Sequence, residues 1–304
     1  MKPRRHIAGQ TVMLTRRTVA RQYFLRPDDR INHIVKYEVA RAASRHGQVV
    51  HGAMCMSNHP HIVVSDTTGN RSDFMRDAMS GIARARNHDL GRRGYFWDSQ
   101  PYGDTVLLDV DTATRKLIYT WLNPVSAGLV KRAEDWPGFK ILPRDWGKTI
   151  EVECPDGFYG RGSPDTVTFT PMPPPGFEDM ELEEAIEHFE NLLRQAEDEL
   201  LQQHENRRFK GVQAVLAVEP FDMPTTIETF RTLNPRFATT DAELMEKAKN
   251  LYREFLECYE RRRQRWLKGK KQVTFPCGTI QLRRQAPIKC EAPDPTEPGL
   301  IAAG

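Results

Sequence analysis

The sequence predicts an α+β protein built on a small antiparallel sheet with helices on one face. Stretches rich in β-forming residues alternate with amphipathic helical stretches through residues 1–147, in the order β-α-β-β-α-β-α. Two of the expected strands follow one another across a very short turn, a connection that only antiparallel neighbours can use. This order is typical of a ferredoxin-like split βαβ sandwich, here followed by one additional helix.

The elements of this region follow from residue type and apolar spacing. Residues 11–18 are rich in β-formers and predict the first strand. Apolar residues recur at helical spacing through 29–46 and through 71–90, so each segment predicts an amphipathic helix. The last helix of the region is expected to stop before Asn123-Pro124, because proline disfavours helix at the preceding residue. The remaining predicted elements are strands at 48–56, 60–65 and 104–110 and this last helix at 111–122.

The rest of the chain predicts a linker and a mainly helical extension. Residues 148–176 are irregular and end in Pro171-Met-Pro-Pro-Pro-Gly176, which is typical of a stiff linker at a domain boundary. A long acidic helix is expected at 177–206, with its apolar stripe on the first domain and its carboxylates in water. The domains are therefore expected at 1–147 and 177–289. The other predicted parts are short elements at 212–240, a helix at 241–268, a β-hairpin at 272–284 and a disordered tail at 290–304.

Composition predicts a soluble protein without a membrane span. The chain of 304 residues is 39% hydrophobic and 28% charged, and it contains no apolar run of about 18 residues. The first residues are basic but lack the apolar stretch of a signal peptide. Five scattered cysteines form no CxxC pair, which argues against a disulfide framework or a zinc ribbon. We therefore expect a cytoplasmic protein.

Charge is distributed unevenly along the chain. Residues 1–147 hold 23 Lys and Arg against 14 Asp and Glu, and residues 207–290 hold 18 against 9. Residues 151–206, in contrast, hold 2 against 15. Two basic regions separated by an acidic one favour a protein that binds a polyanion, although random clustering on a solvated surface would give a similar pattern.

Two histidines stand at the start of the third expected strand. His59 and His61 are two residues apart, and a strand turns side chains i and i+2 to the same face. Both imidazoles are therefore expected to point the same way, with ring nitrogens able to share a metal ion. Such a pair is common, so its meaning depends on what the rest of the chain supplies.

The helix expected at 111–122 carries a polar stripe on an otherwise apolar surface. Arg115, Tyr119 and Asn123 are spaced i, i+4 and i+8 and so share one face. A stripe of this kind is either an ordinary surface line or a functional site. For Tyr119 alone, the ordinary interpretation is a buried ring whose hydroxyl reaches a partner.

These motifs together resemble the REP-associated tyrosine transposases, which belong to the single-tyrosine HUH (His-hydrophobic-His) transposases. The resemblance covers residues 1–145, and residues 209–285 resemble the C-terminal extension of a longer subgroup. One departure is Pro60 between the histidines, where the family prefers a bulky hydrophobe and where proline is tolerated mainly at an edge or a strand start. The residues that carry the resemblance are Ser57, Asn58, His59, His61, Tyr119, Asn123, Pro124, Val125, Ala127, Gly128, Leu129, Val130, Trp136 and Pro137.

The resemblance implies an HUH-type domain that cleaves and rejoins single-stranded DNA, at hairpin-flanked sites, through a 5′-phosphotyrosine intermediate. Tyr119 would be the nucleophile, and His59, His61 and Asn123 would hold a divalent metal. A phosphodiester is negatively charged and a phenol has a pKa of about 10, so a bound cation suits this chemistry. The amide oxygen of Asn123 suits a hard cation, which favours Mg²⁺ or Mn²⁺ over zinc. A single tyrosine on the presumed catalytic helix argues against two-tyrosine initiators and relaxases.

Basic and aromatic residues near this site are expected to contact DNA. Arginine suits the phosphate backbone, and aromatic rings stack on unpaired bases. Tyr95 is a further candidate for stacking, and the basic run 261–271 is a second candidate phosphate-binding patch. Each of these charges also has the ordinary interpretation of a solvated side chain. The residues predicted to bind DNA are Arg4, Arg5, Arg16, Arg17, Arg21, Arg92, Arg93, Trp97 and Arg115.

Two other functions fit part of the pattern. A hydrolytic metallo-phosphoesterase would require further His or Asp ligands close to the histidine pair, and Ile62-Val63-Val64 follow instead. A domesticated, non-catalytic nucleic-acid-binding protein would keep the same fold and basic surface without the chemistry. A covalent DNA adduct separates this alternative from the transposase. The sequence is compatible with a monomer or a homodimer.

Overall fold

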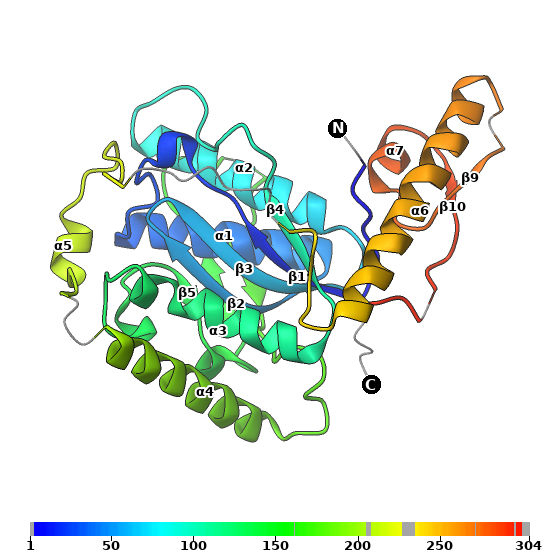
Figure 1. Cartoon of the computed structure of the whole chain (residues 1–304). Coiled ribbons are helices and arrows are strands. Elements are labelled where there is room, and N and C mark those ends of the chain that lie inside the picture. The colour runs from blue at the N-terminus through cyan, green and yellow to red at the C-terminus, as the bar shows by residue number, and fades with distance from the viewer. Residues whose placement is uncertain are drawn as a thin grey trace.

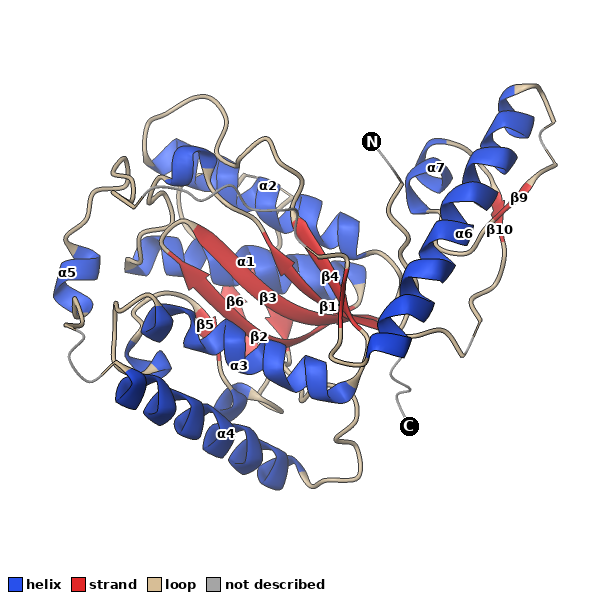
Figure 2. Cartoon of the chain, in the orientation of Figure 1, coloured by secondary structure: helices blue, strands red, loops and turns tan. Residues whose placement is uncertain are grey.

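The computed structural model describes residues 3–160, 162–204, 208–226, 235–270, 272–294 and 296–299. A six-stranded sheet lies between two layers of helices (Figure 1, Figure 2), and its strand order is β5-β2-β3-β1-β4-β8. The four central strands pair antiparallel, which confirms the predicted ferredoxin-like arrangement. The strands of this sheet are β1 Gln10–Thr15, β2 Gln48–Met56, β3 His59–Asp66, β4 Gly103–Leu107, β5 Lys140–Ile141 and β8 Phe237–Ala238.

Helices cover both faces of the sheet rather than one. Helices α1 (Asp29–His46) and α2 (Arg71–Asp89) pack on one face. Helix α3 (Val110–Ser126) packs on the other face and is itself covered by α4 (Leu182–Gln203). Strand β3 shows the reason, since its alternate side chains enter the two different cores. Short 3₁₀ helices lie at Val19–Arg21, Ala133–Asp135 and Pro143–Asp145.

The helix end predicted before Pro124 is wrong, because α3 continues to Ser126. Proline has no N–H and so cannot donate the usual helical hydrogen bond to the carbonyl of Thr120. The side chain of Asn123 supplies a donor instead: its Nδ2 lies 3.3 Å from Thr120 O and 2.8 Å from Tyr119 O. A local side-chain hydrogen bond therefore offsets the missing backbone donor and lets the helix run on.

The segment predicted as an irregular linker contains a β-hairpin. Strands β6 (Ile150–Glu153) and β7 (Thr166–Phe169) pair antiparallel, and their apolar side chains are buried in the core beside α1. The proline-rich part is also fixed, because Met172 N donates to Val50 O (3.1 Å). The strands have only four residues each and lie among Pro and Gly, which hides their alternation in the sequence.

In the C-terminal part, only the two long helices were predicted correctly. The acidic helix expected at 177–206 is α4, and it packs its apolar stripe on the rest of the chain, as expected. The hairpin expected at 272–284 is wrong, since β9 is followed by a helix and pairs parallel with β10. The expected tail is also corrected where it is described, because Glu297 is buried and pairs with Arg5; residues 300–304 lie outside the described residues. The elements are α5 Val212–Leu216, α6 Ala242–Leu267, β9 Thr274–Phe275, α7 Ile280–Gln285 and β10 Lys289–Cys290.

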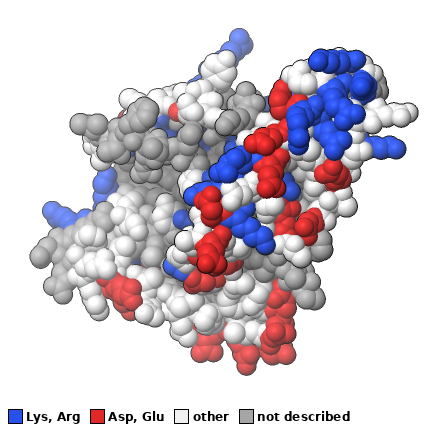
Figure 3. All heavy atoms as spheres, turned by 45° about the vertical axis from the view of Figure 1, so that its right-hand side comes forward, with Lys and Arg blue, Asp and Glu red and all other residues white. Residues whose placement is uncertain are grey.

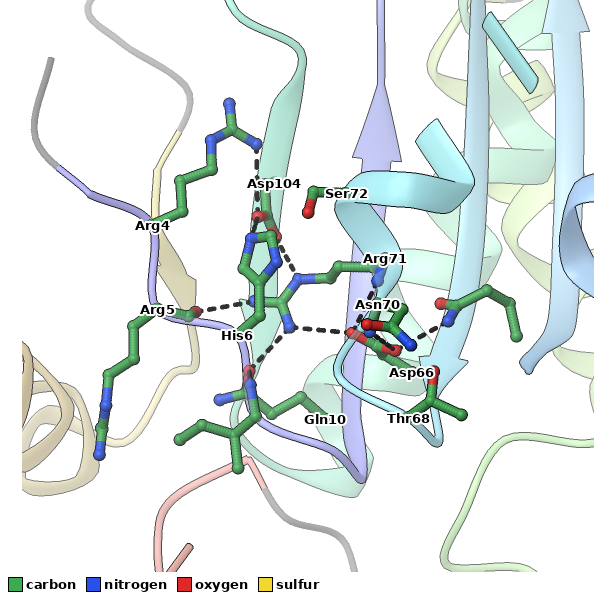
Figure 4. Close-up of polar contacts among 12 residues, drawn as sticks. Arg4, Arg5, His6, Gln10, Asp66, Thr68, Asn70, Arg71, Ser72 and Asp104 are labelled. Atoms are coloured by element: carbon green, nitrogen blue, oxygen red, sulfur yellow. Dashed lines mark hydrogen bonds and ion pairs between the residues drawn. The ribbon is translucent and has the colours of Figure 1, made fainter. Parts of the chain in front are cut away.

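A buried ion cluster joins the N-terminal segment to α2 and β4 (Figure 4). The guanidinium of Arg71 is fully buried, and its Nε donates to Asp104 Oδ1 (3.0 Å) while Nη1 donates to Gln10 Oε1 (3.0 Å). Arg71 also lies 3.4 Å from Asp66 Oδ2. Burial alone would raise the pKa of Asp104, but the charge of Arg71 and the contact with His6 hold it well below its usual range.

No described helix is both long enough and apolar enough to cross a lipid bilayer.

Candidate active site

The two histidines on β3 face helix α3. Val63, at the same parity as His59 and His61, lies in the core with α3, whereas Ile62 and Val64 lie in the core with α1 and α2. The two imidazole rings are 4.8 Å apart between centroids and meet edge to face at 77°. The predicted common orientation of the pair is therefore what the strand produces.

Tyr119 on α3 lies directly against this pair. The centroid of its ring is 5.8 Å from that of His61, at an interplanar angle of 89°. The side chain is 47% exposed, so its hydroxyl can be reached from solvent, in contrast to the buried ring of the ordinary interpretation. Lys116 lies one turn earlier on α3, with its Nζ 5.2 Å from the Tyr119 ring centroid.

His59 is oriented by Asn58. The amide Nδ2 of Asn58 donates to Arg21 O (3.0 Å), so its Oδ1 is the atom that faces His59 Nδ1 at 2.6 Å. His59 Nδ1 is therefore the donor in this bond, and this tautomer places the ring's lone pair on Nε2. A histidine held in this way by its second nitrogen is typical of a metal ligand.

His61 has the properties of a neutral, ligating imidazole. Burial lowers its pKa to about 4, and the charges of Arg17 and Lys116 act in the same direction. Its Nδ1 is buried and has no hydrogen-bond partner among the described residues. Because an unsatisfied buried nitrogen is costly, this atom fits a ligand that the protein itself does not supply.

Asn123 has one side-chain atom free of the helix. Its Nδ2 is directed at backbone carbonyls of its own helix, so its Oδ1 points away from them. Two imidazoles and an amide oxygen would be a donor set that suits Mn²⁺ better than Mg²⁺, which prefers oxygen ligands alone. Among the described residues, no group of three or more His, Cys, Asp or Glu side chains could hold a metal ion.

Pro60 fits the sheet without leaving an unmet hydrogen bond. It pairs with Cys55 on β2, and Cys55 N donates outward to Phe139 O (2.9 Å), so the two residues form a non-hydrogen-bonded pair. The nitrogen of Pro60 therefore faces the β1 side, where the ladder has already ended with Thr15 opposite His61. Proline is tolerated there because no partner strand requires its N–H.

The predicted DNA-binding arginines do not all lie at this site. Arg4 bonds to Asp104 of β4 and to Tyr102 O, two strands away from β3, and Arg5 pairs with Glu297. Arg17 acts electrostatically on His61 and so belongs to the site. The remaining placements are Arg16 beside the Trp97 ring, Arg21 on Thr226, Arg92 on Asn87 and Tyr95, Arg93 exposed, and Arg115 paired with Asp111 and bonded to Thr240.

The stacking role predicted for Trp97 is wrong. Its side chain is 8% exposed, and its indole Nε1 donates to Met79 O (2.8 Å). The ring is part of the core and offers no open face to a base. Tyr95, in contrast, is 87% exposed.

Sequence reasoning assigned no role to three residues that the structure brings to the site. Lys116 and Asn58 stand beside recognised residues in the sequence, so local spacing could have suggested them. Thr226 could not be found in this way: its carbonyl and hydroxyl oxygens accept hydrogen bonds from Arg21 at 2.7 and 2.8 Å, across 205 residues of sequence. The C-terminal part of the chain thus reaches the loop that orients His59.

Solved structures are similar to this chain over part of its length. No protein-family model matches the chain, and no curated protein matches it. Among solved structures, it is similar to a REP-associated tyrosine transposase bound to a REP hairpin, at 20% identity and a TM-score of 0.39, over 47% of this chain and 82% of that one. It is also similar to a Deinococcus radiodurans R1 protein provisionally assigned as a transposase, at 19% identity and a TM-score of 0.29, over 40% and 95%. TM-scores this low correspond to partial superpositions, so neither the family nor an activity follows from them.

Proposed function

We propose that this chain cleaves and rejoins single-stranded DNA, at hairpin-flanked sites, through a transient covalent bond between Tyr119 and a 5′ phosphate. The observation that carries the proposal is the contact between Tyr119 and His61. It joins an exposed phenol to a buried imidazole with a low pKa and a nitrogen that has no partner among the described residues. The proposed nucleophile, which is exposed, therefore lies in direct contact with a proposed metal ligand.

The proposed chemistry balances without an external energy source. Tyr119 Oη attacks the phosphorus, and the bond from phosphorus to the 3′ oxygen breaks. The phenol loses a proton and the departing oxygen takes one up, which leaves a free 3′-OH. Attack by a 3′-OH on the phosphotyrosine reverses these steps and restores a phosphodiester. Lys116 and Arg17 would offset the negative charge that the phosphate brings to the site.

A divalent metal, Mn²⁺ or Mg²⁺, fits the residues present. His59, His61 and the Oδ1 of Asn123 would hold it, and a bound cation would polarise the phosphate and stabilise developing charge on oxygen. Asn58 keeps His59 in the tautomer that this role requires.

A covalent-adduct assay tests the proposal. The full chain is incubated with a library of single-stranded hairpin DNAs and Mn²⁺ or Mg²⁺ and analysed on a denaturing gel. The wild type is expected to give a protein–DNA adduct, and Tyr119→Phe is expected to give none while it still binds the DNA. Tyr95→Phe is the matched control, because it removes the hydroxyl of another exposed tyrosine and should leave the adduct unchanged.

Two results would contradict the proposal. An adduct that persists in Tyr119→Phe would assign the nucleophile elsewhere. A wild type that binds hairpin DNA but forms no adduct with any member of the library would support the non-catalytic binding protein instead.

A further inference from the structure

The distal end of α6 is strongly basic. Residues 261–270 contain six Lys and Arg and no Asp or Glu. Figure 3 shows these charges gathered at the end of the helix that projects from the molecule, while acidic and basic side chains alternate closer to the sheet. Arg262 and Arg263 lie 3.8 and 3.7 Å from Glu291 and Glu260, so those two charges are partly offset.

Three of the other four cations form a stripe. Arg261, Arg265 and Lys268 follow one another at i, i+4 and i+7, which places them on one face of the helix. All three are exposed and have no ion pair among the described residues. Along the helix axis they rise by about 6 Å and then by about 4.5 Å, so the three charges lie close together in one row. The same face is acidic nearer the sheet, at Glu254 and Glu257, so the stripe is confined to the helix end.

The stripe is held at a fixed place relative to the sheet. The base of α6 is anchored where Tyr252 donates to Pro3 O (2.9 Å) and stacks with the guanidinium of Arg236 at 4.0 Å. Its distal part packs through Tyr259 on Phe275 of β9, with 6.0 Å between ring centroids. The helix leaves the sheet at the β4 edge, near the Gln10 end of β1, whereas the histidine pair lies beside the Thr15 end (Figure 1). The stripe is thus a surface separate from the candidate active site.

We infer that Arg261, Arg265 and Lys268 form a second nucleic-acid interface, which binds the phosphate backbone of a duplex stem while the candidate active site binds the unpaired strand. This inference rests on the proposed function only for the identity of the ligand as DNA. A row of exposed cations suits a phosphate backbone, which carries no sequence information. A hairpin supplies both parts at once, so the two surfaces would act on one molecule.

Equilibrium binding tests the inference. Full-length Tyr119→Phe protein, which cannot be captured covalently, is titrated by fluorescence anisotropy at several salt concentrations. The two ligands are a hairpin with a long stem and a short single strand without one. Neutralising the stripe in Arg261→Gln/Arg265→Gln/Lys268→Gln is expected to weaken hairpin binding by roughly tenfold or more and to reduce the salt slope by about 2.7, or about 0.9 per lost phosphate contact. Binding of the single strand is expected to stay unchanged.

The matched control removes the same charge from the same helix. Lys247→Gln/Lys249→Gln/Arg253→Gln changes three exposed cations near the base of α6 and should leave hairpin affinity within a factor of about two. An equal loss in both triple variants, or an equal loss for the single strand, would overturn the inference. So would unchanged hairpin binding in the stripe variant, including the case in which it loses binding to anionic phospholipid vesicles instead. If the hairpin binds as expected but the wild type forms no adduct, the proposed cleavage fails and this interface stands.

Discussion

Asn123 has a structural role in α3 and a proposed role as a metal ligand, and a double-mutant cycle tests the first. Its Nδ2 donates to Thr120 O, the carbonyl that Pro124 leaves without its usual helical donor. Asn123→Ala removes this donor. Pro124→Ala restores a backbone N–H at the correct position for the same carbonyl.

The size of the effect follows from burial. Thr120 has no exposed surface, so its carbonyl cannot turn to water when the donor is lost. An unsatisfied buried acceptor costs about 1–3 kcal/mol. At 3.3 Å the bond is long, so we expect the lower end, about 1 kcal/mol, for Asn123→Ala in the wild-type background. In the Pro124→Ala background the same change should cost close to nothing.

The assay compares the four proteins: wild type, the two single variants and the double variant. Urea unfolding followed by circular dichroism gives the midpoints, and thermal unfolding checks them, with a shift of a few degrees expected for about 1 kcal/mol in a chain of this size. An equal cost of Asn123→Ala in both backgrounds would refute the compensation. The Pro124→Ala background also isolates the proposed metal-binding role of Asn123. In that background Asn123→Ala should not damage the helix, so a loss of Mn²⁺ binding would be due to the loss of the Asn123 Oδ1.

Three further outcomes are expected. Mn²⁺ should raise the thermal midpoint of the wild type but not of His61→Ala, because a ligand that binds only the folded state stabilises it; a shift retained in His61→Ala would exclude that ligand. His51 is buried, which lowers its pKa to about 4 from about 6.5 in the unfolded chain. The unfolded chain therefore takes up a proton first as the pH falls. The resulting contribution to the free energy of unfolding, about 3 kcal/mol, is complete above pH 6.5 and is lost as the pH falls toward 4. The difference in stability between wild type and His51→Gln, from urea titrations, should shrink over that interval, and a constant difference would contradict it. Glu197→Ala should destabilise the chain by about 1–3 kcal/mol, because it leaves the buried Ala133 N–H without its acceptor at 2.7 Å, whereas exposed Glu187→Ala should change little in the same titrations.

The elements that the sequence predicted well are those with a long, regular pattern. The helix predicted at 29–46 and the strand predicted at 48–56 agree with α1 and β2, and the alternation in β3 correctly gave both histidines the same face. Local physics determines these features, since the apolar period decides which side is buried. The contact between Tyr119 and His61 needed more, because it depends on α3 covering the second face of the sheet.

The features that the sequence did not predict depend on contacts between distant residues. Strands β6 and β7 have four residues each, too short for a visible period, and they form because α1 offers an apolar surface. Trp97 is buried because its ring packs in the core beside α2, where its indole donates to Met79 O. Pro124 misled the prediction because proline only disfavours helix at the preceding residue, and here the Asn123 side chain also replaces the backbone donor that proline lacks.

The C-terminal part of the chain helps to build the site. Ala20 and Arg21 adopt left-handed conformations, with φ of 49° and 59°, which are strained for residues with a side chain. Thr226 holds the guanidinium of Arg21, the carbonyl of Arg21 accepts from Asn58, and Asn58 in turn accepts from His59. A contact made by the segment at 208–226 therefore stabilises the loop that sets the tautomer of a proposed metal ligand. Since Phe189 of α4 is also buried against Trp121 of α3, removing the chain after residue 147 would expose the core behind Tyr119 as well. The candidate site is thus a property of the whole fold rather than of the first 147 residues.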